Sequence, residues 1–113
     1  MIKNSIVLVP FPFDDFSNMK VRPAVCLTGE IGIFNHVVIA FISSKIPNEI
    51  LPSDIIIKLD TDNNSEMGLV IDSMIRLHKL VTIPKTLIKR KLGVLNNDVN
   101  KEVKKKLKDL FGI

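Results

Sequence analysis

Short apolar runs, divided by residues that favour turns, cover most of the chain. We expect strands at residues 6–9, 21–28, 37–42 and 54–59, because these runs are rich in β-branched residues and end at prolines, glycines, serines or acids. Pro23 lies near the start of the second run, where its missing N–H costs no ladder hydrogen bond. The pattern therefore predicts several short strands joined by turns.

Three stretches carry less regular patterns. Residues 11–18 and 60–68 combine acids with turn-forming residues and are predicted to be surface loops. Residues 86–93 fit a short helix or a step from helix to strand, and the periodicity does not decide between them.

Residues 73–80 alternate more clearly between apolar and polar positions. Successive side chains of an extended strand point to opposite faces. One face would therefore carry Met74, Arg76 and His78, and the other Ile75, Leu77 and Lys79. Arg76 and His78 are therefore predicted to be neighbours on one surface of a sheet.

The last stretch predicts an amphipathic helix. Asn97 or Asp98 can cap it, and Gly112 ends it. Its apolar stripe consists of Val99, Val103, Leu107 and Leu110 or Phe111. Short strands followed by one helix indicate an α+β fold, mostly β, with a small barrel or sandwich and the C-terminal helix packed on it.

The chain has 113 residues, 46% of them hydrophobic, which suits one globular domain over residues 1–113. No apolar run approaches the roughly 20 residues that cross a bilayer. The first apolar run is too short for a signal peptide and is closed by Pro10, so we expect a cytoplasmic protein. The single cysteine, Cys26, has apolar neighbours and is expected to be a packing residue rather than a nucleophile.

Basic residues gather at one end of the chain. Residues 85–113 hold nine of the sixteen lysines and arginines but only three of the twelve acids, within a net charge of +4. A basic end suits a polyanion or an acidic protein tail as partner. For the last stretch alone, a solvated, lysine-rich helix is the favoured alternative.

Several familiar catalytic motifs are absent. The chain has no phosphate-binding glycine loop, no GxGxxG, GxSxG or HExxH motif, and no pair of cysteines for zinc. Its two histidines, His36 and His78, are far apart in sequence, and the acids of the predicted loops are usually just solvated in such turns. We therefore expect neither a metal nor another cofactor.

Cleavage of RNA is one chemistry that needs no metal, because the ribose 2′-OH can attack the adjacent phosphate. One group must take the 2′-OH proton, a second must stabilise the negative charge on the phosphate, and a third must protonate the leaving 5′-oxygen. Arg22 and Arg76 suit the second task, because they lie in or beside predicted strands that would hold a guanidinium rigidly. Histidine titrates near neutral pH, so His78 suits proton transfer. The alternatives are a salt bridge for either arginine and a structural role for the histidine.

Several segments agree in order and spacing with one known family. Residues 6–15 (IVLVPFPFDD) and 21–25 (VRPAV) correspond to a strand, a PFPF-like loop and a K-R-P-A-V/L motif. Residues 40–44 (AFISS) correspond to an A-x-I-T-S strand end. Residues 72–83 (DSMIRLHKLVTI) correspond to a D-S-V-I-R-x-x-x-L-x-T-I segment, and residues 87–93 to the stretch that follows it. On these motifs, nearly the whole chain resembles the MazF/PemK toxin family.

The resemblance implies an SH3-like small barrel (MazF/CcdB-like) that forms a homodimer. It implies a toxin that binds single-stranded RNA in a groove and cuts it without a metal, leaving a 2′,3′-cyclic phosphate and a 5′-OH. Phosphate chemistry is implied for Arg22 and Ser43, and a second catalytic pair for Arg76 and His78. The resemblance also implies an antitoxin with an acidic, disordered tail that fills the groove, which suits the basic balance of the chain.

The chain departs from the family pattern at three places. Asn4-Ser5 stands where the family has Gly-Asp, Ser43 where it has threonine, and His78 where some members have an acid. Serine keeps the hydroxyl, but its freer rotamer is expected to lower the rate. Because arginine is a poor proton donor, we assign charge stabilisation to the two arginines and proton transfer to His78.

Further residues are expected to contact RNA, namely Phe13, Phe16, Lys20, Ser44 and Lys79. The two phenylalanines are candidates for base stacking, since an aromatic face suits any unstacked base. A buried loop anchor is at least as good an interpretation for both.

Two functions without cleavage stay open. The same barrel carries toxins that poison DNA gyrase by binding it, and fold alone does not choose between the two activities. An inactive relic that still binds its antitoxin is the other alternative. Arg22 and Ser43 favour the nuclease, and cleavage of single-stranded RNA in the presence of a chelator would discriminate.

Overall fold

One curled antiparallel sheet forms the body of the molecule in the computed structural model, which describes residues 2–11, 20–60 and 64–113. The strands are β1 (Ser5–Phe11), β2 (Lys20–Cys26), β3 (His36–Ser43), β4 (Asp54–Ile57), β5 (Ser73–Pro84) and β6 (Arg90–Val94). The other described elements are the 3-10 helices η1 (Asn64–Met67) and η2 (Lys85–Leu87) and the α-helix α1 (Asn97–Phe111).

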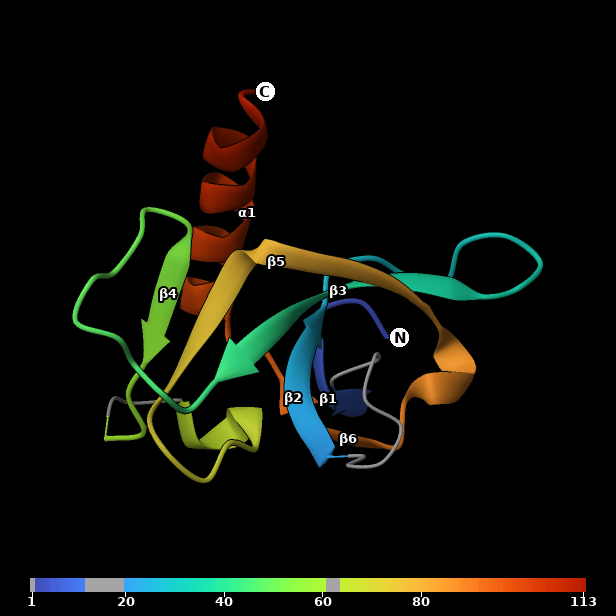
Figure 1. Cartoon of the computed structure of the whole chain (residues 1–113), viewed down its shortest axis with the longest axis horizontal. Coiled ribbons are helices and arrows are strands. Elements are labelled where there is room, and N and C mark those ends of the chain that lie inside the picture. The colour runs from blue at the N-terminus through green and yellow to red at the C-terminus, as the bar shows by residue number, and fades with distance from the viewer. Residues whose placement is uncertain (1, 12–19, 61–63) are drawn as a thin grey trace.

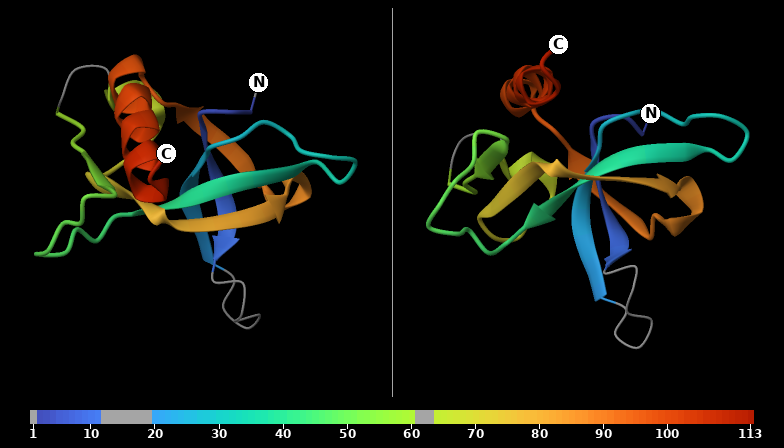
Figure 2. Two further views of the ribbon diagram at one scale, coloured as in Figure 1. Left: turned by 90° about the horizontal axis from the view of Figure 1, so that it is seen from above. Right: turned by 45° about the horizontal axis from the view of Figure 1, so that its top comes forward.

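The six strands follow the order β4-β5-β3-β2-β1-β6, and every neighbouring pair is antiparallel. The sheet bends into a half-barrel, with α1 on the side of β4 and β5 and the β2–β3 connection projecting away from it (Figures 1 and 2). The expected fold class, a mostly β small barrel with a C-terminal helix, is confirmed.

Alternate residues of the central strands fill two different cores. Ile6 of β1 packs in one cluster with Met67 of η1 and Val103 of α1, whereas its neighbour Val7 packs in the other with Cys26 of β2. Strands buried on both faces appear in sequence as near-continuous apolar runs. The Cys26 side chain is fully buried, and this burial raises the pKa of its thiol to about 11, so its expected packing role is confirmed.

The predicted strands are all present, with shifted ends. β5 runs on to Pro84, while β2 and β4 stop at Cys26 and Ile57, each two residues before the predicted end. Residues 86–93 fall mainly into η2 and β6, which corresponds to the step from helix to strand.

The expected surface loop at residues 60–68 is wrong for its second half, where η1 forms. Met67 is fully buried because it fills the core beneath the sheet. Asn64 is also buried, and its side-chain amide donates to the carbonyl oxygen of Lys58 at 2.8 Å and accepts from Nδ2 of Asn96 at 2.7 Å. An apolar side chain and a satisfied amide thus hold this turn against the core.

The helix α1 begins earlier than predicted. Its cap is Asn96, whose Oδ1 accepts a hydrogen bond from the backbone N–H of Val99 at 2.8 Å, so the expected caps Asn97 and Asp98 are wrong and lie in the first turn. Gly112 ends the helix as predicted, with φ +70°.

Only the first part of the predicted apolar stripe packs on the barrel. Val99, Val103 and Leu107 contact the core cluster. Leu110 and Phe111 are 41% and 59% exposed, because the last turns of α1 extend beyond the sheet (Figure 1).

The sheet opens on one side of β2. This strand pairs with β1 along its whole length but with β3 only from Ala24 onward. Residues 20–23 therefore have no described strand on the β3 side, and Pro23 loses no ladder bond there, as expected.

A shift of register in β5 distorts the facing side of this opening. Between the pairs Ile42–Ile75 and Ala40–Leu80, β5 advances by five residues while β3 advances by two. The extra residues bend the strand and re-aim its side chains, so the simple alternation predicted for residues 73–80 fails in its second half.

Candidate functional site

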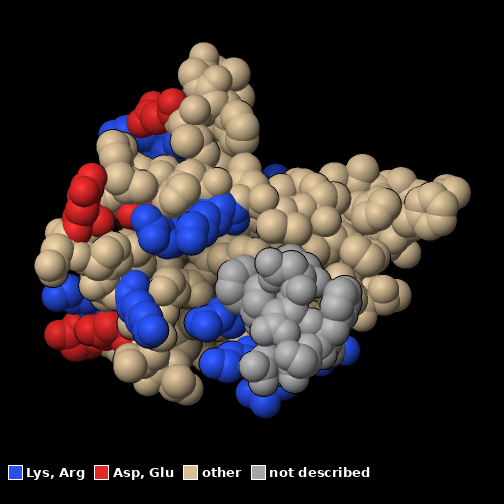
Figure 3. All heavy atoms as spheres, in the orientation of Figure 1, with Lys and Arg blue, Asp and Glu red and all other residues tan. Residues whose placement is uncertain are grey.

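A cavity of about 220 Å³ lies where β2, β3 and β5 meet, and we call it the cationic cavity. Among the described residues, every charged side chain that lines it is positive, and the hydroxyl of Ser43 lines it as well. The polar lining residues are Arg22, Ser43, Lys45, Arg76 and Lys79. Figure 3 shows Lys and Arg side chains gathered on the face of the molecule where these strands lie. The cavity thus brings together four of the site residues predicted from the sequence. Lys45 is the one polar residue in this list that was not predicted.

Arg22 enters the cavity from the open part of β2. Its backbone pairs with Val9 of β1, and the rigid Pro23 follows it. Its side chain is half-buried and lines a neighbouring pocket as well as the cationic cavity. Because Arg22 lies on the border between the cationic cavity and the neighbouring pocket, its guanidinium can contact groups in both.

A buried carboxylate holds Arg76. The side chain of Asp54 is completely buried, and its Oδ1 accepts a hydrogen bond from Nε of Arg76 at 3.2 Å. Oδ2 accepts from the backbone N–H of Leu51 at 2.9 Å, and Nζ of Lys106 in α1 donates to the Asp54 carbonyl oxygen at 2.7 Å. Because these contacts fix Asp54 from the segment before β4, from β5 and from α1, Asp54 in turn restricts the Arg76 guanidinium at the cavity wall.

His78 lies next to this ion pair but outside the cationic cavity. Its Nδ1 is 3.0 Å from Oγ of Ser53 and 3.9 Å from Oδ1 of Asp54. It lines a separate cavity of about 520 Å³, together with Lys106 of α1. Arg76 and His78 therefore converge on one carboxylate oxygen, as neighbours on one face can, but His78 is not among the groups around Arg22 and the cavity.

The Ser43 hydroxyl is engaged in a tight turn. It donates to the carbonyl oxygen of Lys45 at 3.1 Å and accepts from the backbone N–H of the same residue at 3.1 Å. These bonds hold the Lys45 backbone in a turn beside the cavity that both residues line.

The neighbouring pocket has a volume of about 400 Å³, and we call it the flanking pocket. Its polar groups include Arg22, the predicted contact residue Ser44, and Arg90 of β6. Apolar side chains of Val21 and of residues 69–71 form much of its wall. The flanking pocket and the cationic cavity share Arg22.

The remaining predicted contact residues are less informative. Lys20 is exposed at the start of β2 and is absent from the linings of both spaces. Phe13 and Phe16 lie outside the described residues.

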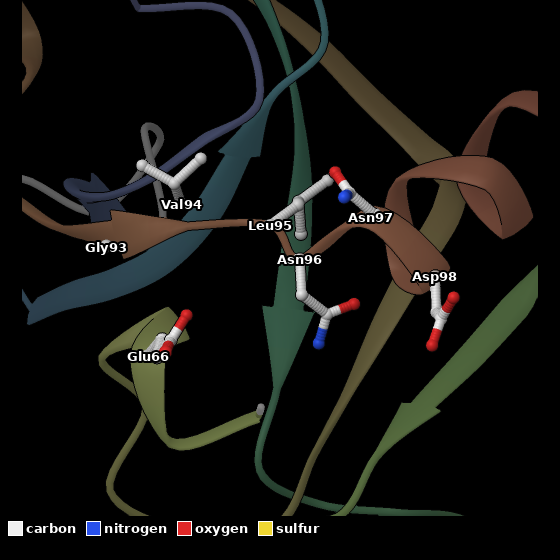
Figure 4. Close-up of a pocket in the computed structure, with 7 residues that line it drawn as sticks. All are labelled: Glu66, Gly93, Val94, Leu95, Asn96, Asn97 and Asp98. Atoms are coloured by element: carbon white, nitrogen blue, oxygen red, sulfur yellow. The ribbon is translucent and has the colours of Figure 1, made fainter. Parts of the chain in front are cut away.

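Another cavity, of about 710 Å³, lies between η1, β6 and the start of α1 (Figure 4). None of the predicted site residues that the structure describes lines it. Its charged lining groups, Glu66 and Asp98, are both acids and are unsuited to a phosphate.

Sequence reasoning missed three residues of this region. Lys45 directly follows the Ser43-Ser44 motif, and Arg90 lies in the basic end of the chain, so proximity and charge were the available signals. Asp54 is harder to find, although an acid that opens an apolar, β-branched run stands apart from the acids of turns.

Within residues 2–11, 20–60 and 64–113, no three His, Cys, Asp or Glu side chains are grouped so that they can hold a metal ion. In the same part of the chain, no helix combines the length and apolar content needed to cross a membrane.

Solved structures share this architecture. The toxin MazF-mt6 of Mycobacterium tuberculosis superposes with a TM-score of 0.72 and 20% identity over 96% of this chain and 97% of that one. An endoribonuclease in complex with its cognate antitoxin, from a mycobacterial species, superposes with a TM-score of 0.71 and 10% identity over 100% and 96%. In a MazE–MazF structure from Deinococcus radiodurans, one chain superposes with a TM-score of 0.69 and 17% identity over 100% and 97%. No curated protein matches the sequence.

A family profile gives the assignment that these low identities leave open. Residues 3–111 match the family of PemK-like, MazF-like toxins of type II toxin–antitoxin systems. The match spans every element from β1 to α1. The chain therefore belongs to the PemK/MazF toxin family of type II toxin–antitoxin systems.

Proposed function

We propose that this toxin is a metal-independent endoribonuclease that cleaves single-stranded RNA at the cationic cavity. The observation that carries the proposal is the convergence of Arg22, Lys45, Arg76 and Lys79 with the Ser43 hydroxyl around one space, with no acid among the described residues that line it. A phosphodiester gains charge stabilisation from such a cluster, and the arginine forks match its oxygens.

The proposed reaction is attack by the neighbouring ribose. The 2′-oxygen loses its proton and bonds to phosphorus, the bond from phosphorus to the 5′-oxygen breaks, and the 5′-oxygen takes up a proton. The products are a 2′,3′-cyclic phosphate and a 5′-OH. Arg22 and Arg76 stabilise the charge on the phosphate oxygens, and Lys45 and Lys79 attract the strand.

Asp54 is a positioning residue in this proposal. Being buried, it is shielded from RNA, but its hydrogen bond to Nε leaves the outer nitrogens of Arg76 to serve the cavity. Carboxylates behind a functional cation commonly set its orientation in this way.

His78 is proposed to transfer the proton. Nδ1 of His78 and Nε of Arg76 both lie near Oδ1 of Asp54. The distance between these two nitrogens is therefore at most the sum of their distances to that oxygen. A ribose next to a phosphate held by Arg76 then comes near the imidazole ring.

The proposed partners follow from the charge of the site. An antitoxin with an acidic, disordered tail suits a cavity lined by cations, and the tail would compete with RNA for it. The homologous mycobacterial endoribonuclease was solved with its cognate antitoxin, which supports this partner class. We also propose that the toxin acts as a homodimer in the cytoplasm, with residues 1–113 forming one domain.

The test is cleavage of a long, unstructured RNA by the purified protein in EDTA. We expect discrete cuts with cyclic phosphate ends, lost in Arg22→Ala and kept in Lys104→Ala, a matched loss of charge at an exposed position of α1. Intact RNA with the wild-type protein would contradict the proposal and favour a toxin that binds a protein target such as DNA gyrase, or an inactive antitoxin-binding relic.

A further inference from the structure

We propose that Lys106 of α1 is a positioning residue for RNA cleavage, because it holds the backbone of Asp54 and, through Asp54, fixes the Arg76 guanidinium at the cationic cavity. This inference rests on the proposed ribonuclease function and deepens it by giving the C-terminal helix a part in the reaction. Lys106 lines the cavity of His78 and is not among the described residues that line the cationic cavity. It therefore acts through Asp54 and not on the phosphate.

Lys106 differs from the other lysines of its helix. Of the five lysines in α1, four are exposed, whereas the side chain of Lys106 is 27% exposed. Its Nζ donates to the carbonyl oxygen of Asp54 at 2.7 Å and lies 3.5 Å from Oε2 of Glu102, one turn earlier in the helix. Ordering a long, flexible side chain costs conformational entropy, which these two contacts offset. Lys106 is therefore a fixed link between α1 and the sheet.

The carbonyl group that Lys106 binds lies at the edge of the sheet. β4 ends the strand order, with β5 as its one neighbour among the described strands. Asp54 is paired with Arg76, and the N–H of Leu77 donates to the carbonyl oxygen of Ser53 at 3.1 Å. Since hydrogen-bonded and non-hydrogen-bonded pairs alternate in an antiparallel ladder, the Asp54 carbonyl points away from β5. Asp54 is buried, so this oxygen needs a donor, and Lys106 supplies it.

The same pairing carries the effect from Asp54 to the cavity. The two residues of a non-hydrogen-bonded pair lie close together, and here Oδ1 of Asp54 accepts from Nε of Arg76 at 3.2 Å. The connection that leads to β4 gives little support, because residues 44–50 are all exposed. The start of β4 is therefore held mainly from α1, and a shift of the Asp54 backbone would move the oxygen that orients Arg76.

The helix is a suitable support because it is itself anchored. Val103 is buried in the core cluster, and Leu107, next to Lys106 in sequence, packs against the same cluster. The rigidity of this core thus reaches Arg76 through two hydrogen bonds, from Nζ of Lys106 to the Asp54 carbonyl and from Nε of Arg76 to the Asp54 carboxylate. Groups that lie behind a functional side chain commonly set its orientation in this way.

The experiment compares two neighbouring lysines of α1. Lys106→Met removes the ammonium group and keeps a long apolar stem, and Lys106→Arg restores hydrogen-bond donors. Lys105→Met removes the same charge from the adjacent, exposed position and is the matched control. Glu102→Gln, which weakens only the ion pair, is a milder second variant. Steady-state cleavage kinetics at fixed salt, thermal unfolding, and the NMR resonance of the Arg76 Nε–H without RNA are measured for each protein.

We expect Lys106→Met to lower kcat by about fivefold with little change in KM, a smaller loss than the roughly 10-fold typical of a group that supports the functional one directly. Lys106→Arg should regain most of the rate, Glu102→Gln should lose about twofold, and Lys105→Met should match the wild type. In the Arg76→Ala background, Lys106→Met should cost nothing further. The Arg76 Nε–H should exchange faster with water in Lys106→Met, and not in Lys105→Met, because its hydrogen bond to Asp54 is loosened.

The outcomes separate this inference from the function on which it rests. If the wild type cuts RNA and Lys106→Met lowers the unfolding temperature but keeps kcat and the Arg76 resonance, Lys106 is a structural residue only and the ribonuclease stands. An equal loss of kcat in Lys105→Met would show that the charge of α1 acts, not the contact with Asp54, which also overturns the inference. Intact RNA with the wild type removes the function itself, and with it a role of Lys106 in cleavage, even where the Arg76 resonance responds to Lys106→Met.

Discussion

The cations of the cavity and the lysines of α1 differ in what holds them. Lysines of α1 such as Lys101, Lys104, Lys105 and Lys108 are exposed side chains of one helix, and together they make the C-terminal end of the sequence basic. The cavity instead collects Arg22 and Arg76 from strands that are far apart in the chain, with Asp54 fixing one of them. Concentration of charge in a sequence predicts a basic surface, whereas a binding site for phosphate requires convergence in space.

The largest effect that would test this contrast is loss of an arginine from the cavity. Arg76→Ala should lower the rate of RNA cleavage by about 10²–10³-fold, because one group that stabilises the developing phosphate charge is removed. Lys104→Ala with Lys105→Ala removes two charges from α1 and should leave the rate within about twofold, since exposed charges act weakly through salt-containing water. Initial rates on one RNA at fixed salt give the comparison. An equal loss in both variants would mean that bulk charge, not convergence, drives cleavage.

A slightly smaller effect is expected for the proposed proton-transfer group. His78→Ala should lower the cleavage rate by about 10²-fold and flatten the rise of rate with pH, because general-base catalysis requires the neutral imidazole. His36→Ala is the control, because this other histidine lies at the start of β3 and lines neither the cationic cavity nor the flanking pocket. Rates measured across a pH series decide the matter. A His78→Ala profile parallel to that of the wild type would remove His78 from the proton transfer.

The Asp54 carboxylate sharpens the contrast, because it is the support that the helix lysines lack. Asp54→Asn keeps an oxygen near Arg76 but removes the charge, and should lower kcat by about 10-fold with little change in KM. In the Arg76→Ala background the same substitution should cost nothing further, because there is then no guanidinium to position. Steady-state kinetics and thermal unfolding of the four proteins measure this. A full additional loss in the Arg76→Ala background would show that Asp54 acts only through stability.

Ser43 should respond modestly. Ser43→Thr restores the residue that the family pattern carries, and its β-branched side chain has fewer rotamers, so we expect kcat to rise by about twofold. Ser43→Ala removes both hydrogen bonds to the Lys45 backbone and should lower kcat. A rate for Ser43→Thr below that of the wild type would mean that the turn has no room for the methyl group.

The smallest effect lies outside both regions, at Cys26. Burial raises the pKa of its thiol from 9.0 to about 11, so above pH 9 the unfolded chain ionises while the folded protein keeps its proton. This group therefore contributes a loss of stability as pH rises between about 9 and about 11. Urea unfolding of the wild type and of Cys26→Ala at pH 8 and pH 10 should show a steeper decline for the wild type. Identical slopes would show that the thiol is not protected.

Prediction from sequence succeeded wherever a local pattern decides the outcome. The β-branched runs gave the strands, and Gly112 gave the end of α1, because these depend on near neighbours. It failed where distant segments decide. Met67 is buried because the interior under η1 has room for it, and nothing in the polar stretch around it indicates that space.

The same distinction between local patterns and contacts of distant segments applies to the candidate site. Arg22, Ser43, Arg76 and Lys79 could be named from a resemblance of motifs, but their meeting at one cavity could not. His78 lines a different cavity and lies in the part of β5 where the register shifts, a feature that the alternation of residues 73–80 does not reveal.

The two cores on either side of the central strands determine which positions of the chain tolerate substitution. Since neighbouring residues such as Ile6 and Val7 fill opposite interiors, few positions in the middle of these strands would tolerate a polar replacement. Substitutions accumulate more easily at the rim, at exposed positions such as Val70 and Ile71 that border the flanking pocket. A library that varies this rim and leaves the strands intact should therefore keep the fold while it changes the surface around Arg22.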